Sequence, residues 1–164
     1  MRSQNPHIKH SNKTSQRICK NLYSKVFKTI LIPFHYESLK DQKKLQSKEG
    51  RKEALKSFMY KSFESLNFNS YQMAVTVYYS DLFLSEFSNR GFKFSYIFLK
   101  SILIVSMITC HKITCDVCYS NSSLQEYFNV DNLAELEAEY YGMVDFKINF
   151  PLDKVFEYLD LLLE

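Results

Sequence analysis

Tryptophan is absent from this sequence, and glycine and proline are scarce, with three residues of each among 164. The absence of tryptophan decides nothing about the fold. The shortage of glycine and proline argues against a sheet rich in turns, because such turns depend on both residues. Hydrophobic residues make up 46% of the chain, which is enough for one domain to bury a sizeable core. The composition therefore predicts an all-α protein with one domain.

The sequence also lacks an apolar run as long as the ~20 residues that a membrane span needs. The most apolar stretch, residues 101–110, is bounded by Lys100 on one side and by His111 and Lys112 on the other. It predicts a buried helix and no membrane partner. The first residues are polar and basic, without the apolar core of a secretory signal. The expected location is therefore cytoplasmic and/or nuclear, where thiols are kept reduced.

Motifs that carry catalysis are missing as well. The chain has no Ser-His-Asp arrangement, no glycine-rich phosphate loop and no HExxH sequence. Glu135, Glu137 and Glu139 are spaced two apart, so each points to a different helix face from the next in the series, which is poor geometry for a paired acid and base. We expect no enzymatic activity, no cofactor and no small-molecule substrate.

The cysteines raise the question of a metal or redox site. Cys115 and Cys118 form a CxxC sequence, with Cys110 and His111 close by, while Cys19 is the remaining cysteine. A structural zinc site needs four ligands and usually a second well-spaced pair, which is missing here. A thioredoxin-type site needs a strand followed by a helix. We therefore predict no metal site, and we expect His111 to be a partly exposed residue near a helix end, where the helix dipole favours its protonated form.

Charge is unevenly distributed along the chain. Residues 1–56 hold 14 Lys and Arg against 4 Asp and Glu, whereas residues 57–164 hold 7 against 14. A basic end can attract nucleic acid, membrane headgroups or an acidic partner, or it can be a solvated tail. We expect residues 1–14 to be a disordered basic tail. Residues 15–52 are expected to form an N-terminal amphipathic helix, with apolar residues every four positions from Ile18 to Ile30, and a charged linker.

Five further helices are predicted by apolar periodicity, and residues 114–129 between the third and the fourth are polar and read as irregular. Ser70 is the expected cap of the second helix, with Asn69 and Gln72 at capping-box spacing. Asn89 and Gly91 form a stop signal after this helix, and Asp131 is the expected cap of the fourth. The third helix is apolar on nearly every face, so it belongs in the middle of a bundle. The predicted spans are residues 53–66, 71–87, 94–113, 133–143 and 152–163.

Four short motifs in this order resemble those of the cyclin box. They are VYYSDLF at residues 77–83, MITCHK at 107–112, LAELE at 133–137 and DFKI at 145–148. Their order and spacing are most similar to the single-box cyclins of the phosphate-signalling and P/U types. The resemblance implies a five-helix cyclin box over residues 53–164, preceded by an additional N-terminal helix.

The resemblance also implies a function and a set of site residues. A cyclin-like regulatory subunit binds and activates a cyclin-dependent kinase, so the implied partner is a kinase catalytic subunit. Lys112 and Glu137 match the family's lysine and glutamate that hydrogen-bond the kinase main chain. Asp81 matches an aspartate that pairs with a buried arginine in the family, and Lys61 stands at the arginine position. The pair Lys61 and Asp81 is therefore expected to be a structural ion pair, weaker than one made by the planar guanidinium.

Departures from the family pattern leave a second interpretation open. Small residues that precede the family lysine are replaced by Thr109, Cys110 and His111, and the asparagine of the fourth-helix motif is Ala134. The alternative is a degenerate cyclin-fold scaffold or adaptor subunit of a larger assembly, without kinase activation. In that interpretation the basic N-terminal third offers a secondary route to nucleic acid.

Overall fold

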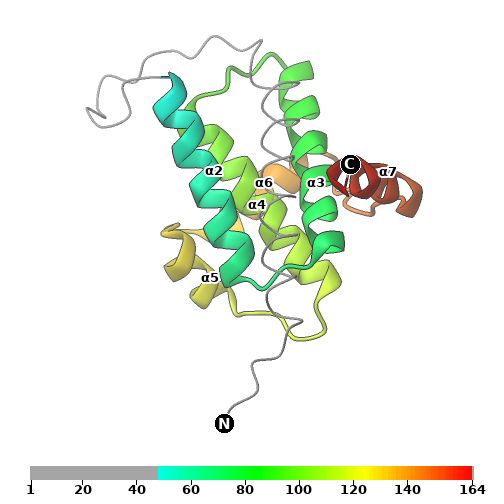
Figure 1. Ribbon diagram of the computed structural model, residues 1–164. Coiled ribbons are helices and arrows are strands. Elements are labelled where there is room, and N and C mark those ends of the chain that lie inside the picture. Colours follow the sequence, from blue (N-terminus) through cyan, green and yellow to red (C-terminus); the bar gives the residue numbers. More distant parts are fainter. Residues whose placement is uncertain (1–47, 164) are drawn as a thin grey trace.

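The computed structural model describes residues 48–163, and the predicted tail, N-terminal helix and most of the linker lie outside this part of the chain. Within it every regular element is a helix, which confirms the all-α prediction. The helices are labelled in Figure 1. They are α2 (Lys48–Ser65), α3 (Ser70–Asn89), α4 (Tyr96–Thr114), α5 (Asn121–Phe128), α6 (Leu133–Met143) and α7 (Leu152–Leu163).

Helix α4 is the centre of the bundle, as its apolar sequence predicts. It packs against α2, α3 and α6, and eleven of its residues are buried, including an unbroken run from Ile102 to His111. A helix that buries residues on consecutive positions has neighbours on all of its faces. By length and composition alone, α4 also passes as a candidate membrane span within the described residues, although most of it is buried inside the protein. A core helix passes the same test, so the observation adds no argument for a membrane.

Helix α3 has the boundaries that its sequence signals predict. Asn69 is the N-cap, and a capping box joins its side chain to the backbone of Gln72 while the Gln72 side chain accepts from the backbone of Asn69. The helix ends at Asn89, and Gly91 follows with a φ of 78°. Only glycine adopts such a left-handed backbone at no steric cost. The capping box and the stop signal are therefore both confirmed, but the expected cap was wrong, because Ser70 is the first residue of the helix and Asn69 caps it.

Helix α3 is also the link between the centre and the edge of the bundle. It packs against α4 on one side and against α7 on the other, with a further contact to α6. Figure 1 shows α7 outside α3, and α5 on the opposite side of the bundle, near the lower end of α2. The bounds of α6 and α7 are those predicted, residues 133–143 and 152–163.

Three further expectations about element boundaries were wrong. The segment read as irregular contains α5, whose N-cap is Ser120 and whose buried residues Leu124 and Phe128 are four apart. The N-cap of α6 is Asn132 and not Asp131, because the Asn132 side chain accepts from the backbone N–H of Glu135. Helix α2 begins at residue 48, five residues before the predicted start at residue 53.

Candidate functional site

Lys112 and Glu137 meet where the last turn of α4 passes α6. The Lys112 Nζ lies 2.8 Å from Oε1 and 2.6 Å from Oε2 of Glu137, so the ammonium donates to both carboxylate oxygens. The two side chains differ in exposure, with 32% of Lys112 and only 7% of Glu137 accessible to solvent. The structure thus brings together the two residues that the cyclin resemblance singles out, and it turns the lysine towards solvent more than the glutamate.

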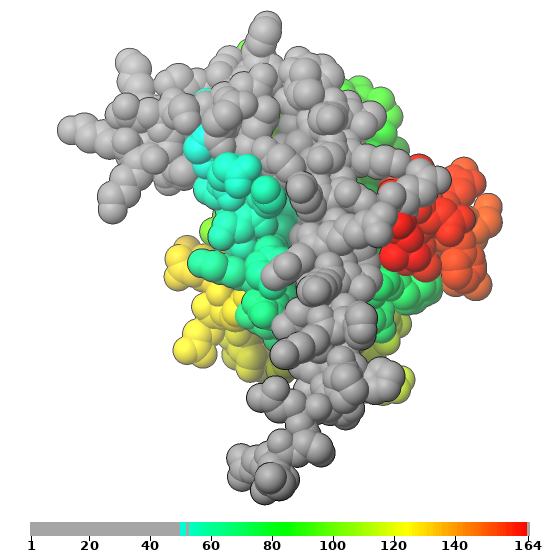
Figure 2. Space-filling view, viewed as in Figure 1, coloured from blue at the N-terminus to red at the C-terminus, as the bar shows by residue number. Residues whose placement is uncertain are grey.

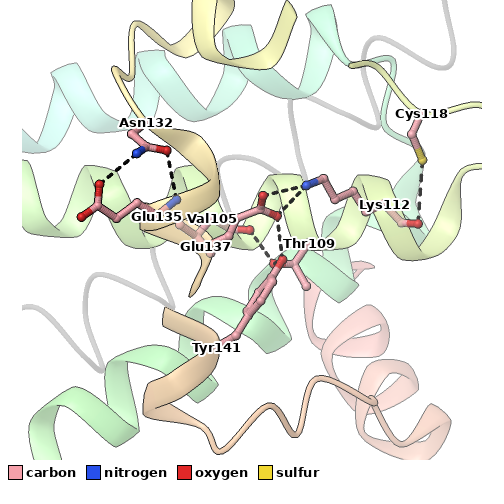
Figure 3. A network of polar contacts seen from close by, with 8 residues as sticks. All are labelled: Val105, Thr109, Lys112, Cys118, Asn132, Glu135, Glu137 and Tyr141. Carbon is pink, nitrogen blue, oxygen red and sulfur yellow. Dashed lines mark hydrogen bonds and ion pairs between the residues drawn. The ribbon is translucent and has the colours of Figure 1, made fainter. Parts of the chain in front are cut away.

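Two further side chains extend the pair into a network (Figure 3). The Tyr141 hydroxyl donates to Oε1 of Glu137 at 2.9 Å, and Thr109 Oγ1 lies 3.0 Å from the same hydroxyl. Thr109 in turn donates to the carbonyl of Val105 at 2.7 Å. Burial, together with the charge of Glu137, raises the pKa of the Tyr141 hydroxyl above its ordinary value, so the group stays a neutral donor. The network fixes the Glu137 carboxylate from two sides.

A groove of about 360 Å³ opens beside this network. Its floor and walls come from the last turns of α4, one face of α6 and the connection to α7, and most of them are apolar. Phe146 projects at its edge with 66% of its surface exposed. The lining residues are Thr109, Lys112, Ile113, Ala134, Glu137, Ala138, Tyr141, Phe146 and Ile148. An apolar groove with one buried ion pair at its side is the kind of surface that binds a protein segment and fixes its orientation.

The connection that carries Phe146 has an unusual backbone. Asp145 and Phe146 are consecutive residues with positive φ, 51° and 58°. For a bulky residue such as phenylalanine this conformation is a strained outlier, and it persists only where the surroundings impose it. Here the Phe146 N–H donates to the carbonyl of Tyr141 at 2.7 Å, and Tyr79 donates through its hydroxyl to the carbonyl of Ile148. The ring is therefore held at the groove by backbone contacts and not by packing in the core.

The expected ion pair between Lys61 and Asp81 does not form. Lys61 is exposed on α2, and its carbonyl accepts a long hydrogen bond of 3.4 Å from the Tyr127 hydroxyl. The Asp81 carboxylate accepts from the hydroxyl of Tyr158 on α7. The prediction failed because α2 packs on α4, whereas the Asp81 face of α3 is turned to α7.

His111 is also placed differently from the expectation. It is buried and not partly exposed, and its ring stacks between Phe68, at 6.2 Å, and Tyr119, at 5.0 Å. Burial lowers the pKa of the imidazole, which opposes the protonated form that the helix dipole was expected to favour. Its Nδ1 has no hydrogen-bond partner among the described residues.

The cysteines in the last turns of α4 and just after it act here as weak hydrogen-bonding groups. The Cys110 thiol is buried and donates to the carbonyl of Gln72, and burial raises its pKa to about 12. Cys115 accepts from the Gln72 side chain at 3.2 Å, while Cys118 is exposed and lies 3.3 Å from the Cys115 carbonyl. Within residues 48–163, no three His, Cys, Asp or Glu side chains are grouped so that they could hold a metal ion.

Sequence reasoning missed Tyr141, Thr109 and Phe146 as members of the site. A signal was present for two of them, because Tyr141 follows Glu137 by four residues and Thr109 precedes Lys112 by three, which places each on the same helix face as its partner. Phe146 carried no such signal, since its exposure depends on two left-handed residues.

No protein-family model, no curated protein and no solved structure matches this chain.

Proposed function

We propose that this protein is a cyclin-like regulatory subunit that binds and activates a cyclin-dependent kinase through the groove beside Lys112 and Glu137. In this proposal α2, α3, α4, α6 and α7 are the five helices of a divergent single cyclin box, and α5 is a short insertion. The chain itself performs no chemistry.

The observation that carries the proposal is the contact between Lys112 and Glu137. The two residues are 25 positions apart in the sequence and were selected by motif likeness alone, yet the ammonium reaches both carboxylate oxygens within 2.8 Å. A lysine already held by a buried carboxylate loses little rotamer freedom when a partner binds, which lowers the entropic cost of association. The remaining exposure of Lys112 leaves it accessible to a partner.

The groove supplies the apolar part of the interface. Phe146, from the connection between α6 and α7, and Ile113, from the end of α4, are both exposed and line the same groove as the ion pair. Interfaces are dominated by a few aromatic and aliphatic anchors that become fully desolvated, with charged groups at their sides fixing the register. Activation additionally requires that the groove bind the active arrangement of the kinase more tightly than the inactive one, since equal affinity shifts no equilibrium.

A scaffold or adaptor role is the second candidate, and the burial of Glu137 favours it. The side chain of Glu137 is 7% exposed, and its oxygens accept hydrogen bonds from Lys112 and Tyr141. Contacts within this chain are therefore sufficient to stabilise the buried carboxylate. In that case the Lys112–Glu137 pair joins α4 to α6 and has no part in kinase binding.

The experiment that separates the two is purification of the tagged protein from its own cells, followed by mass spectrometry of the partners and a kinase assay. The informative variants are Lys112→Ala and Phe146→Asn, because asparagine tolerates the left-handed backbone while removing the ring. Lys147→Ala is the matched control for charge, since the Lys147 side chain is exposed and pairs with the exposed Asp145 at 3.7 Å. Melting temperatures verify that each variant is folded.

On the kinase proposal, a cyclin-dependent kinase catalytic subunit and its activity are recovered with wild type and Lys147→Ala, and both decrease at least tenfold with the two groove variants. Recovery of a stable set of non-kinase partners that does not respond to Lys112→Ala or Phe146→Asn would overturn the proposal and favour the scaffold.

A further inference from the structure

Helix α7 exposes more large apolar side chains than its position in the fold explains. Four of them, Leu152, Phe156, Leu161 and Leu163, are exposed on a helix of 12 residues. Figure 2 shows this helix, coloured orange to red, at one edge of the molecule. Its principal neighbour among the described helices is α3. One face is therefore sufficient to hold α7 in place, and the remaining apolar residues are available to solvent.

The apolar residues of α7 form two separate rows. Val155 and Leu162 are buried and Tyr158 is half-buried, and this row faces α3, where Tyr158 reaches Asp81. The second row has the spacing four, three, four, which is the spacing of the a and d positions of a coiled coil. It consists of the exposed residues Leu152, Phe156 and Leu163 and of Leu159, which is half-buried against the core; these four residues are named the α7 seam.

Charges beside the α7 seam are of one sign. With Phe156 and Leu163 at a positions and Leu152 and Leu159 at d positions, both e positions are aspartates, Asp153 and Asp160. The g positions are the buried Val155 and Leu162. Neither aspartate forms an ion pair with a residue of the described part, whereas the lysine of this helix, Lys154, is engaged with Glu157 at 2.9 Å on the other side. The open border of the seam is thus acidic.

This border excludes a second copy of α7 as the occupant. In an antiparallel pair the e positions face each other, so Asp153 and Asp160 would meet aspartates. In a parallel pair the e positions face g positions, which here are buried against α3 and carry no charge. Like charges opposite each other destabilise such pairs, and an unpaired aspartate in the contact adds a desolvation cost.

We infer that the α7 seam binds an amphipathic helix of a partner protein that carries Lys or Arg beside its apolar row. The 12 residues of α7 extend over about 18 Å, so a partner helix of three to four turns matches the seam in length. The leucines and Phe156 supply the buried contact, and the two aspartates select the basic partner. This surface belongs to α7, and the groove of the proposed function does not contribute to it.

Fluorescence anisotropy with three synthetic helical peptides tests the inference on the full chain. The first has leucine at the a and d positions with lysine at e and g, the second has glutamate at e and g, and the third keeps lysine but has serine at a and d. We expect the first peptide to bind at least tenfold more tightly than either of the others. The difference in affinity between the lysine and glutamate peptides should decrease as salt is added. Equal binding of the lysine and glutamate peptides, or no binding of the first, would overturn the inference.

Variants then locate the binding on α7. Phe156→Ser and Leu152→Ser each replace an exposed residue, so we expect both variants to fold as the wild type does. Each should lower the affinity for the first peptide at least tenfold. Leu161→Ser is the matched control, because Leu161 is exposed on the same helix but lies at an f position, away from the seam. The double change Asp153→Asn with Asp160→Asn removes the preference for lysine over glutamate. Unchanged binding in the serine variants of the seam, or a dimer of the free protein in sedimentation, contradicts the inference.

Discussion

His111 shows how much a single buried residue can affect the pH dependence of stability. Its ring lies between two aromatic rings, and its Nδ1 is buried without a hydrogen-bond partner among the described residues. Burial holds its pKa below the ordinary value of 6.5, so the folded protein binds the proton less readily than the unfolded chain. His111 therefore makes its full contribution to the free energy of unfolding above about pH 6.5. This contribution decreases as the pH falls below that value.

We expect His111→Phe to make stability less dependent on pH between 7 and 5. Phenylalanine keeps a ring between Phe68 and Tyr119 but removes both the titrating group and the unpaired nitrogen. The gain in unfolding free energy relative to wild type should grow as the pH falls, by no more than about 1.4 kcal/mol per pH unit. Urea denaturation of both proteins at pH 7 and pH 5 measures it, and an equal difference at the two pH values would contradict the assignment.

At the scale of single residues, the resemblance to cyclins singled out two pairs, and one of the two is in contact. Lys112 and Glu137 were selected together by motif likeness, and they form an ion pair. Lys61 and Asp81 were selected in the same way and do not meet, because helix periodicity gives the faces of each helix but not the neighbour that each face contacts. For the same reason, helix periodicity does not predict the hydrogen bond between Tyr158 and Asp81, which are 77 positions apart.

Between elements, the contact of α3 with α7 depends on one polar link in an apolar interface. The Tyr158 hydroxyl donates to the Asp81 carboxylate, and burial, followed by the effect of this carboxylate, raises the pKa of the tyrosine. The link is accessible from a groove of about 630 Å³ between the two helices. Asp81 therefore has a structural role, as the sequence suggested, but with a different partner.

We expect Tyr158→Phe to lower the free energy of unfolding by roughly 1 kcal/mol, because the hydrogen bond to a charged acceptor is lost while the ring stays packed on α3. Tyr127→Phe is the control, since that hydroxyl is exposed and its bond to the Lys61 carbonyl is 3.4 Å long. Thermal denaturation of the two variants compares them. A melting temperature of Tyr158→Phe equal to that of the control would show that Asp81 is satisfied by water alone.

Element boundaries were predictable wherever side chains cap a helix or a proline or glycine interrupts it. The ends of α3 and the full spans of α6 and α7 follow from such signals. Helix α5 was missed because its eight residues contain just two buried apolar side chains, Leu124 and Phe128. Two positions four apart fit a helix but do not establish a period. A cap at Ser120 was the additional signal that would have found it.

For the whole molecule, the position of α4 determines where substitutions are tolerated. Three other helices surround it, and the residues from 102 to 111 are all buried. Its last turn leaves the core, so Ile113 is 42% exposed while Ile108 is fully buried. The same helix thus contains the centre of the core and the edge of the candidate site.

We expect Ile108→Ala to cost about 2–5 kcal/mol of unfolding free energy, since the surrounding helices cannot fully close the cavity that remains. The same substitution at Ile113 should change stability by no more than about 0.5 kcal/mol, because that side chain is already exposed. Chemical denaturation of both variants gives the two values. Similar costs at the two positions would mean that the end of α4 is packed more tightly than the structure shows.

The Lys112–Glu137 pair does not use all of its hydrogen-bonding capacity within the chain. A lysine ammonium carries three N–H bonds, and two of them are directed at Glu137. A carboxylate offers about four acceptor positions, of which Lys112 and Tyr141 occupy three. One N–H of the ammonium is left, and the 32% exposure of Lys112 makes it accessible, whereas the carboxylate, at 7% exposure, presents almost no free acceptor. The pair therefore presents one hydrogen-bond donor, and no comparable acceptor, at the edge of the groove.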